Sequence, residues 1–361
     1  MNNRINRLRQ ELTRRELDAI LISQPQNRRY LSGFSGSAGF LLISKQEAVL
    51  ATDFRYTEQA TSQAPDYKIF QISGSLAAWL PELIANLGGS NLGFEDGHVT
   101  FALHQQLSNT LKETKSGLSL TPVGGLVESL RAIKEPEEIE LIAKSAEITD
   151  AAFEEVTDRV QPGTTEKQLA WELEKSLREH GSEAMAFEVI VASGPNAALP
   201  HARPSEHQIQ PGEPVVIDMG ARVGGYCSDL SRTICLGTPD DKFRQVYSTV
   251  FKAQSAAIAG INEGMSGHDA DALARAVIEE ANYGQAFGHA LGHGVGLAAH
   301  EEPRLGPNSE DTLRNNMVFS IEPGIYLSGW GGVRIEDLAV MDSGRPRLLS
   351  NAKKWKPEVS S

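Results

Sequence analysis

Apolar residues recur along the chain with two different spacings, and these predict both helices and strands in its first part. Ile5, Leu8 and Leu12 are spaced as on one face of an amphipathic helix. The short runs LDAILIS (17–23) and AGFLLIS (38–44) are apolar and rich in branched side chains, which is typical of buried strands. The chain therefore begins as a mixture of helices and strands.

A break that contains proline and glycine divides the chain into two regions. Residues 98–113 have the pattern of a helix, and the break TPVGG follows at 121–125. Pro136 then suits the first turn of a new helix. Six residues are spaced so that they form one stripe along that helix: Ile139, Ile142, Ala146, Thr149, Phe153 and Val156. We expect an N-terminal domain of residues 1–125 and a second domain of residues 126–361.

The second domain alternates long helices with hairpin-like pairs of strands. The segment QPGTT (161–165) ends the first long helix. Thr165 and Gln168 then have the spacing of a capping box, and Gly181 closes the helix that they start. The predicted fold class is therefore α/β, in the form of an α+β arrangement.

Composition and charge narrow the functional classes. The 361 residues are 40% hydrophobic and 22% charged, as in ordinary globular proteins. The 34 Lys and Arg against 47 Asp and Glu give a net charge of −13, which argues against a nucleic acid as partner. No apolar run approaches the ~20 residues needed to cross a membrane, and the first residues lack the apolar core of a secretory signal. The two cysteines, Cys227 and Cys235, are too few for a disulfide framework, so we expect a cytoplasmic protein.

Three histidines stand in the glycine-rich segment GHALGHGVGLAAHEEP, residues 288–303. His289 and His293 are four residues apart, the spacing at which two histidines share a helical face in zinc proteases. The glycines in and around the pair oppose a helix, because each costs about 1 kcal/mol relative to alanine in a helix interior. We therefore predict a strand or loop, and any further metal ligands must come from elsewhere in the chain.

Two aspartates flank a predicted hairpin in VVIDMGARVGGYCSDLSRTI. Asp218 ends an apolar strand, where a carboxylate is costly to bury without a partner, and Asp229 begins the returning strand. A turn at Val223-Gly224 would place them directly opposite each other, with Cβ atoms about 4.5–5.5 Å apart. A turn at Gly224-Gly225 would offset them by one diagonal step. Since like charges this close repel, the pattern predicts a positive group between them.

The segment MVFSIEPGIYLSGWGGVRIEDLAVM repeats this arrangement in a second hairpin. Glu322 follows an apolar strand, Glu336 lies on the return, and Gly329 is the midpoint. Taken alone, an acidic pair near a hairpin is more often a pair of solvated or turn residues than part of a metal site. The combination of two such hairpins with apolar flanks and a strand that bears histidine predicts a binuclear metal site. The two hairpins also suggest an internal duplication.

Four segments of the second domain, VVIDMGARVGGYCSDLSRT, GHGVGLAAHEEP, SIEPGIYL and GVRIEDLAV, carry a resemblance to a known family. Together with ALPHARP and RAIKEPEEIELI they resemble the signature segments of Xaa-Pro aminopeptidases and Xaa-Pro dipeptidases (prolidases). NRRYLSGFSGSAG and DFRY resemble motifs of that family's N-terminal domain. The resemblance covers essentially the whole chain. It implies a C-terminal pita-bread catalytic domain with pseudo-twofold halves, preceded by a smaller creatinase-like α/β domain.

The resemblance also implies two divalent metal ions per chain. Their ligands would be Asp218, Asp229, His293, Glu322 and Glu336, with Asp229 and Glu336 as bridges. The set is complete, whereas creatinase and some binding proteins of this fold lack it. Four carboxylates and one imidazole favour Mn²⁺ or Co²⁺, with Zn²⁺ and Fe²⁺ as alternatives.

Catalytic and substrate-contacting roles follow from the same resemblance. Glu322 would also take the proton from the attacking water. His201 and His300 would form hydrogen bonds at the scissile bond, and His289 would line the substrate pocket.

Two arginines receive supporting roles. Arg334 lies two residues before Glu336, hence on the same strand face, and could hold Asp218. Arg304 matches an arginine that contacts the C-terminal carboxylate of the substrate in prolidases, and a guanidinium suits a carboxylate. For either arginine, an ordinary exposed side chain is the alternative.

The resemblance implies a metallo-exopeptidase that hydrolyses the bond between an N-terminal residue and proline in dipeptides or short peptides. Its partners would be short proline-containing peptides, with no nucleic acid or membrane, and it would be a homodimer. The alternatives are an aminopeptidase of broader specificity, a metal-free creatinase-like hydrolase, and a catalytically inactive pita-bread binding protein. Whether it is a dipeptidase or an aminopeptidase stays open at this point.

Overall fold

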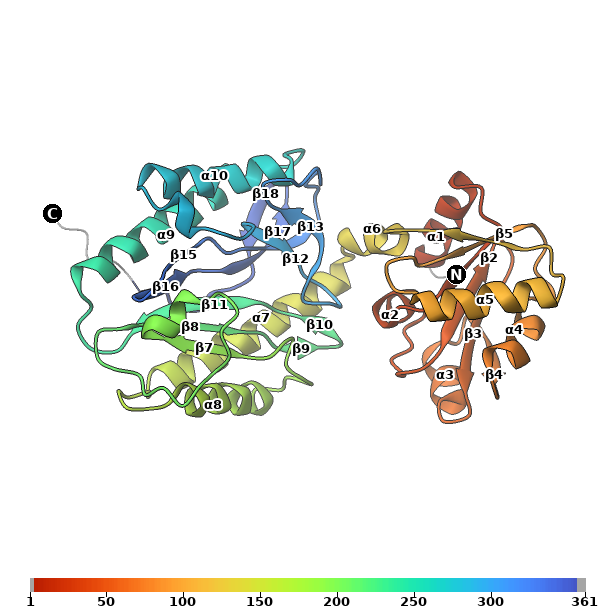
Figure 1. Ribbon diagram of the computed structural model, residues 1–361, viewed down its shortest axis with the longest axis horizontal. Helices are drawn as coiled ribbons and strands as arrows, with labels where there is room; N and C mark the ends of the chain where they lie inside the picture. The colour runs from red at the N-terminus through yellow and green to blue at the C-terminus, as the bar shows by residue number, and fades with distance from the viewer. Residues whose placement is uncertain (1–2, 356–361) are drawn as a thin grey trace. The chain divides into compact units, whose positions relative to one another are not determined.

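The computed structural model describes residues 3–355, and the chain divides into two compact units, Met1–Arg131 and Ala132–Ser361. Each unit combines helices with β-sheet, as Figure 1 shows, which confirms the predicted mixed α/β class. Among the helices of the described residues, none is both long and apolar enough to pass through a bilayer.

Unit 1 is built on one six-stranded mixed sheet in the order β4-β3-β2-β1-β5-β6. β2 pairs antiparallel with β1 and with β3, and the other neighbours are parallel. The strands are β1 (Ala19–Ile22), β2 (Phe40–Ser44), β3 (Ala48–Asp53), β4 (Lys68–Ile72), β5 (Asn91–Phe94) and β6 (Ser119–Pro122). Both strands predicted in this region are confirmed, as β1 and β2.

The helices of unit 1 follow the sequence pattern where that pattern is strong. They are α1 (Asn3–Arg14), α2 (Pro25–Ser32), α3 (Thr57–Gln63), α4 (Leu76–Ile84), α5 (Phe101–Glu113) and α6 (Leu126–Ala132). The predicted first helix is α1, which buries Ile5, Leu8 and Leu12. The helix predicted at 98–113 is α5, and it begins at residue 101 because Thr100 Oγ1 accepts a hydrogen bond from the third helical backbone N–H.

Unit 2 consists of two halves of the same kind, each a pair of long helices packed on an antiparallel sheet. The first half contains α7 (Pro136–Thr157), α8 (Glu166–Glu179) and the sheet β11-β8-β7. The second contains α9 (Asp241–Gly260), α10 (Gly267–Glu280) and the sheet β13-β12-β14-β17-β18. In Figure 1 the two helix pairs lie on opposite sides of this unit, with the strands between them.

Two short ribbons, β9-β10 and β15-β16, complete the unit. Its strands and 3₁₀ helices are β7 (Ile190–Ser193), η1 (Gly194–Ala198), β8 (Pro214–Met219), β9 (Arg222–Val223), β10 (Tyr226–Cys227), β11 (Leu230–Cys235), η2 (Gly284–Ala286), β12 (Gly292–Gly294), β13 (Glu301–Leu305), β14 (Val318–Ile321), β15 (Gly324–Leu327), β16 (Gly331–Arg334), β17 (Asp337–Asp342) and β18 (Arg345–Leu348).

Each half of unit 2 has its own hydrophobic core. In the first, Phe153 and Leu173 from the helices pack in one cluster with Ile217 from the sheet. In the second, Val250 belongs to the same cluster as Phe319. Each core thus lies between a helix pair and one face of a sheet. Polar side chains at the ends of the strands lie outside these cores.

The predicted start of α7 and the predicted ends of α8 are confirmed, whereas α7 already ends at Thr157, before the QPGTT segment. Pro136 is the first residue of α7. The predicted stripe of that helix is buried except for the half-buried Ile139. Thr165 and Gln168 form the reciprocal hydrogen bonds of the capping box at 3.1 and 2.9 Å. Gly181, with φ 103°, follows the end of α8.

The first acidic hairpin has a different register from the one first considered. β9 and β10 pair so that the turn falls at Gly224-Gly225, and the predicted turn one residue earlier is wrong. Both glycines have positive φ, 56° and 85°, which this two-residue turn requires and a β-branched valine adopts only with strain. Asp218 consequently faces Ser231, so the two aspartates are not directly opposed, and Asp229 lies one diagonal step away.

The second acidic hairpin has the register predicted around Gly329. β15 pairs with β16 and β14 with β17 in one continuous register. Glu322 and Glu336 occupy facing positions between these two pairs of strands. The symmetric placement read from the sequence is confirmed here.

Candidate metal centre

One cavity of about 730 Å³ in unit 2 gathers every residue to which the sequence assigned a role. All ten lie on its wall: Asp218, Asp229, His293, Glu322, Glu336, His201, His300, His289, Arg304 and Arg334. They come from both halves of the unit. Folding therefore brings into one place side chains that are far apart in the sequence.

The five groups proposed as ligands lie at or near strand ends. Asp218 is the fifth residue of β8, and Asp229 directly precedes β11. His293 is the middle residue of β12. Glu322 directly follows β14, and Glu336 directly precedes β17. The prediction that the glycine-rich histidine segment is not helical is confirmed, and sheet backbone fixes the origin of each side chain.

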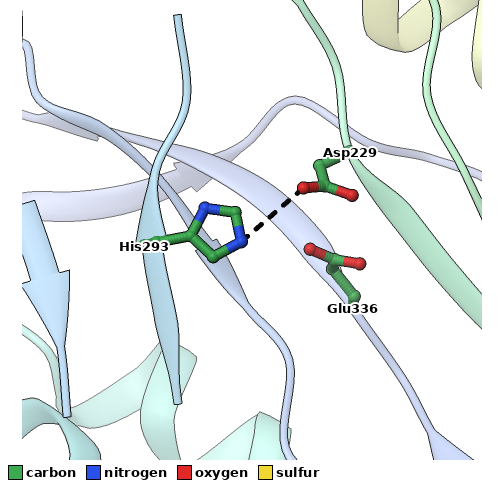
Figure 2. Close-up of side chains that lie close together, drawn as sticks. All are labelled: Asp229, His293 and Glu336. Atoms are coloured by element: carbon green, nitrogen blue, oxygen red, sulfur yellow. Dashed lines mark ion pairs between the residues drawn. The ribbon is translucent and has the colours of Figure 1, made fainter. Parts of the chain in front are cut away.

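Three of these side chains form a close cluster. Asp229, His293 and Glu336 each present one possible ligand atom, and these atoms lie within 4.8 Å of one another. Figure 2 shows the two carboxylates and the imidazole converging from separate parts of the chain. His293 Nε2 is 3.7 Å from Asp229 Oδ2. Such a spacing leaves room for a cation among the three groups.

Glu322 joins this cluster through His293. Glu322 Oε1 lies 3.2 Å from His293 Nε2 and accepts a hydrogen bond from Ser320 Oγ at 3.0 Å. The Ser320 hydroxyl also accepts one from the backbone N–H of His293 at 3.1 Å. Although burial acts in the opposite direction on both groups, their mutual hydrogen bond raises the pKa of His293 and lowers that of Glu322 to about 2. The hydrogen bond thus favours the charged forms of both groups, an imidazolium beside a carboxylate.

Arg334 connects Asp218 with two neighbouring strands. Its Nη2 donates to Asp218 Oδ2 at 2.7 Å, its Nε to Ser231 Oγ at 2.7 Å and its Nη1 to the Tyr326 hydroxyl at 2.8 Å. The Arg334 side chain is 4% exposed. A guanidinium so buried and so bonded fixes the orientation of the Asp218 carboxylate.

His289 continues the hydrogen-bond chain that starts at Arg334. The Tyr326 hydroxyl lies 3.0 Å from His289 Nε2, and His289 Nδ1 lies 2.8 Å from the carbonyl oxygen of Ala290. A proton on Nδ1 satisfies the carbonyl, and Nε2 then accepts the Tyr326 proton. Burial lowers the pKa of His289, which agrees with a neutral ring. Both ring nitrogens are engaged, so His289 offers the cavity the remainder of its ring.

The electrostatics of the cluster favour a cation. Burial raises the pKa of Asp218, Asp229 and Glu336, and neighbouring carboxylates raise all three further, with large shifts at Asp229 and Glu336. Among residues 3–355, Asp218 Oδ1 and Glu336 Oε1 are buried with no hydrogen-bond partner. A divalent ion would supply both the missing positive charge and the missing partner. Four carboxylates and one imidazole thus fit a hard or borderline cation.

Three exposed basic side chains, His201, His300 and Arg304, line the cavity. The His300 ring packs beside that of His293, with centroids 4.0 Å apart. Partial burial and the charge of His293 lower the pKa of His300. His201, on the loop between η1 and β8, and Arg304, in β13, are exposed. Within the described part of the chain, the side chains of His201, His300 and Arg304 form no hydrogen bond or ion pair, so all three are open to a ligand.

Two side chains that hold the site together, Ser320 and Tyr326, were not predicted from the sequence. Ser320 lies two residues before Glu322 and hence on the same strand face, and this alternation was the available signal. Tyr326 and Arg334 are diagonal neighbours in the β15–β16 ribbon. Their contact depends on a strand register that has to be known first.

Each of the two parts of the chain matches a known protein family. Residues 140–343 match the model of metallopeptidase family M24, and residues 4–133 match that of the creatinase/prolidase N-terminal domain. The chain is 34% identical over 355 residues to an Xaa-Pro dipeptidase of Pyrococcus furiosus. That alignment covers 98% of this chain and 99% of the relative.

Solved structures of similar chains share the whole architecture. The Xaa-Pro dipeptidase from Bacillus anthracis matches with a TM-score of 0.93 at 41% identity, over 98% of each chain. The X-Pro aminopeptidase from Thermotoga maritima MSB8 matches with a TM-score of 0.88 at 34% identity, over 98% of this chain and 99% of that one. The expected order of a creatinase-like domain and a pita-bread domain is confirmed. This chain belongs to metallopeptidase family M24.

Proposed function

We propose that this protein is a binuclear-metal exopeptidase that hydrolyses the bond between an N-terminal residue and proline in dipeptides or short peptides. The observation that carries the proposal is the convergence of four carboxylates and one histidine on the wall of a single cavity. Relatives named Xaa-Pro dipeptidase and X-Pro aminopeptidase support the substrate class. The intact donor set argues against an inactive binding protein and against metal-free hydrolysis.

In this proposal the five clustered side chains bind two divalent ions, Mn²⁺ or Co²⁺ in the first place, with Zn²⁺ or Fe²⁺ as alternatives. When bound, two such ions lower the pKa of a water molecule and polarise the peptide carbonyl. Asp218, Asp229, His293, Glu322 and Glu336 would all hold these ions, with Asp229 and Glu336 shared between them. Glu322 also accepts the proton of the nucleophile, and Ser320 holds its carboxylate in place.

His201 and His300 are proposed to act on the leaving group. The peptide nitrogen of proline carries no hydrogen and has to gain a proton when the bond breaks. His201 and His300 line the cavity and have no competing partner among residues 3–355, so they are free to hydrogen-bond to the carbonyl oxygen or to the leaving nitrogen. His289 and Arg334 both form hydrogen bonds with the Tyr326 hydroxyl and so fix the orientation of each other's side chains in the cavity wall.

Arg304 is proposed to favour dipeptides. It lines the cavity and is exposed, so its guanidinium can pair with the free carboxylate of Xaa-Pro. Loss of such a charge-assisted pair costs about 2–3 kcal/mol, or roughly 30- to 150-fold in kcat/KM. Arg203 is a matched control, since it is an exposed arginine on the same cavity that lies 3.7 Å from Glu188.

The proposal is tested with a panel of Xaa-Pro dipeptides, their C-terminal amides, Xaa-Pro-Yaa peptides and peptides without proline, each assayed with Mn²⁺, Co²⁺ and Zn²⁺. We expect cleavage of Xaa-Pro that is lost on chelation, a preference for the free dipeptide over its amide, and loss of that preference in Arg304→Ala but not in Arg203→Ala. Equal cleavage of dipeptide and amide by the wild-type protein would favour the aminopeptidase alternative. Equal cleavage of peptides without proline would favour broader specificity.

We further propose a cytoplasmic homodimer, because the family resemblance implies a dimer and a chain with only two cysteines suits a reducing compartment. Light scattering of the purified protein would give twice the mass of the 39.1 kDa chain if the dimer forms.

A further inference from the structure

Glu166 is a fully buried carboxylate that the proposed metal site does not use. It is the first residue of α8, and its exposed fraction is 0%. Burial of an ionised carboxylate is costly unless hydrogen-bond donors replace water around it. Five donor groups from one stretch of chain, residues 193–205, surround Glu166.

The two oxygens of Glu166 bind the two ends of one loop. Oε1 accepts hydrogen bonds from the backbone N–H of Ser193 at 2.6 Å and from its hydroxyl at 3.0 Å. Oε2 accepts hydrogen bonds from the backbone N–H of Ser205 at 2.9 Å and from its hydroxyl at 2.6 Å. Asn196 Nδ2 lies 3.1 and 3.3 Å from the two oxygens. One carboxylate therefore holds the loop where it leaves β7 and where it returns.

The backbone at the start of α8 reinforces this link. The N–H of Glu166 donates to the carbonyl of His207 and that of Lys167 to the carbonyl of Ser205, both at 3.1 Å. These N–H groups belong to the first helical turn, which has no partners within the helix. The positive end of the helix dipole also favours a carboxylate at this position. Helix start and loop ends thus form one connected structure.

The loop held in this way forms one side of the cavity. Pro200, His201, Ala202, Arg203 and Pro204 all line it. Apart from η1, this loop has no helix or strand of its own. The side chain of His201 is exposed and makes no hydrogen bond within the described residues, so no hydrogen bond of its own fixes its place. The position of the imidazole depends on how the ends of the loop are held.

We propose that Glu166 is a positioning residue that acts through His201. Its carboxylate fixes both ends of the 194–204 loop and so keeps the His201 imidazole at the scissile bond, while Glu166 itself touches no substrate. The inference rests on the proposed function, because it assigns a purpose to His201 in peptide hydrolysis. Arg304, on β13, lies outside this arrangement.

The direct test is Glu166→Gln. The amide has one acceptor oxygen, and its NH₂ group faces the donors of either Ser193 or Ser205, so one end of the loop is released. A displacement of about 1 Å can cost roughly 100-fold in rate. We expect kcat/KM for an Xaa-Pro dipeptide to fall about 10- to 100-fold with unchanged metal content. We also expect faster hydrogen exchange at the Ser193 or Ser205 amide in the metal-free protein.

A double-mutant cycle separates positioning from general destabilisation. In a His201→Ala background, Glu166→Gln should change kcat/KM by less than about twofold, because the group that it positions is gone. Ser205→Ala removes only the hydroxyl hydrogen bond at the second loop end and keeps both the Ser205 backbone N–H and Glu166 itself. It should lower kcat/KM about three- to tenfold and likewise have no effect in the His201→Ala background. Ser205→Ala decides the question if Glu166→Gln does not fold.

Glu95→Gln is the matched control. Glu95 is a buried carboxylate in unit 1 that accepts hydrogen bonds from Ser23, Gln24 and Asn27 at 2.6–3.0 Å, and it does not line the cavity. This variant should keep kcat/KM within about twofold of the wild-type value. The inference is overturned if Glu166→Gln keeps wild-type kcat/KM, or if its loss multiplies with that of His201→Ala. Failure of the wild-type protein to cleave any peptide of the panel would instead refute the proposed function.

Discussion

Asp229→Asn should make the metal-free protein more stable and at the same time remove its stabilisation by Mn²⁺. Burial raises the pKa of Asp229, and Glu336, Asp218 and Glu322 raise it further. A carboxyl group whose pKa is raised by folding binds its proton more tightly in the native state. The ionised form therefore destabilises the metal-free fold, increasingly as the pH rises above its ordinary value of 3.8. Asparagine has no charge and avoids this cost.

The size of the effect follows from the spacing of the cluster. The nearest ligand oxygens of Asp229 and Glu336 lie within 4.8 Å. Two unit charges at that distance repel by about 3.5 kcal/mol at an effective dielectric constant of about 20. Because one carboxyl group can take up a proton, we expect a gain of roughly 1–3 kcal/mol. In a domain of this size that is a rise in Tm of about 2–10 °C.

The assay is differential scanning calorimetry in EDTA and in excess Mn²⁺. The wild-type protein should gain about 4.1 kcal/mol when free Mn²⁺ is at about 1,000 times its Kd, and Asp229→Asn should gain much less, so the order of the two Tm values should reverse. Glu280→Gln, which removes one exposed carboxylate of α10, should change stability by no more than about 0.5 kcal/mol in either buffer. A lower Tm for Asp229→Asn in EDTA would show that the Asp229 carboxylate does not destabilise the metal-free fold, and equal stabilisation of both proteins by Mn²⁺ would show that Asp229 is not a ligand.

Three further predictions concern single side chains. Glu322→Gln should lower kcat by about 10³-fold or more in steady-state assays with saturating Mn²⁺, and activity within tenfold of the wild type would show that another group takes the proton. His300→Ala should lower kcat about 10- to 100-fold while the metal content, measured by mass spectrometry, stays the same; a fall in metal content would make His300 a ligand. Burial raises the pKa of Asp150 to about 6 from its ordinary 3.8. As the pH rises from about 4 to 6, the wild type should therefore lose stability relative to Asp150→Asn, by on the order of 2 kcal/mol. Denaturant titrations of both proteins that show no such trend would contradict this cost of burying the Asp150 carboxylate.

The second acidic hairpin could be predicted from the sequence because its turn is symmetric about Gly329. Glu322 and Glu336 are equally far from that midpoint, and the pairing of β15 with β16 keeps this relation. In the first hairpin two turns differ by one residue, and hydrophobic alternation alone did not choose between them. The requirement for positive φ at both turn positions selects Gly224-Gly225, so the turn chemistry carried the information that the spacing lacked.

Contacts that depend on tertiary structure could not be predicted. The chain from Arg334 through Tyr326 to His289 needs the register of one ribbon and the approach of a distant loop. Glu166 looked like an ordinary first-turn residue of a helix, and the donors of Ser193 and Ser205 reach it only after the loop between them has folded back. Sequence patterns report on local partners, whereas these contacts are made between segments far apart in the chain.

Anomalous diffraction from crystals grown with Mn²⁺ would show directly whether the five clustered side chains bind two divalent ions. We expect two anomalous peaks per chain, both next to Asp229 and Glu336, with His293 beside one of them. A single peak, or none within reach of these side chains, would contradict this expectation.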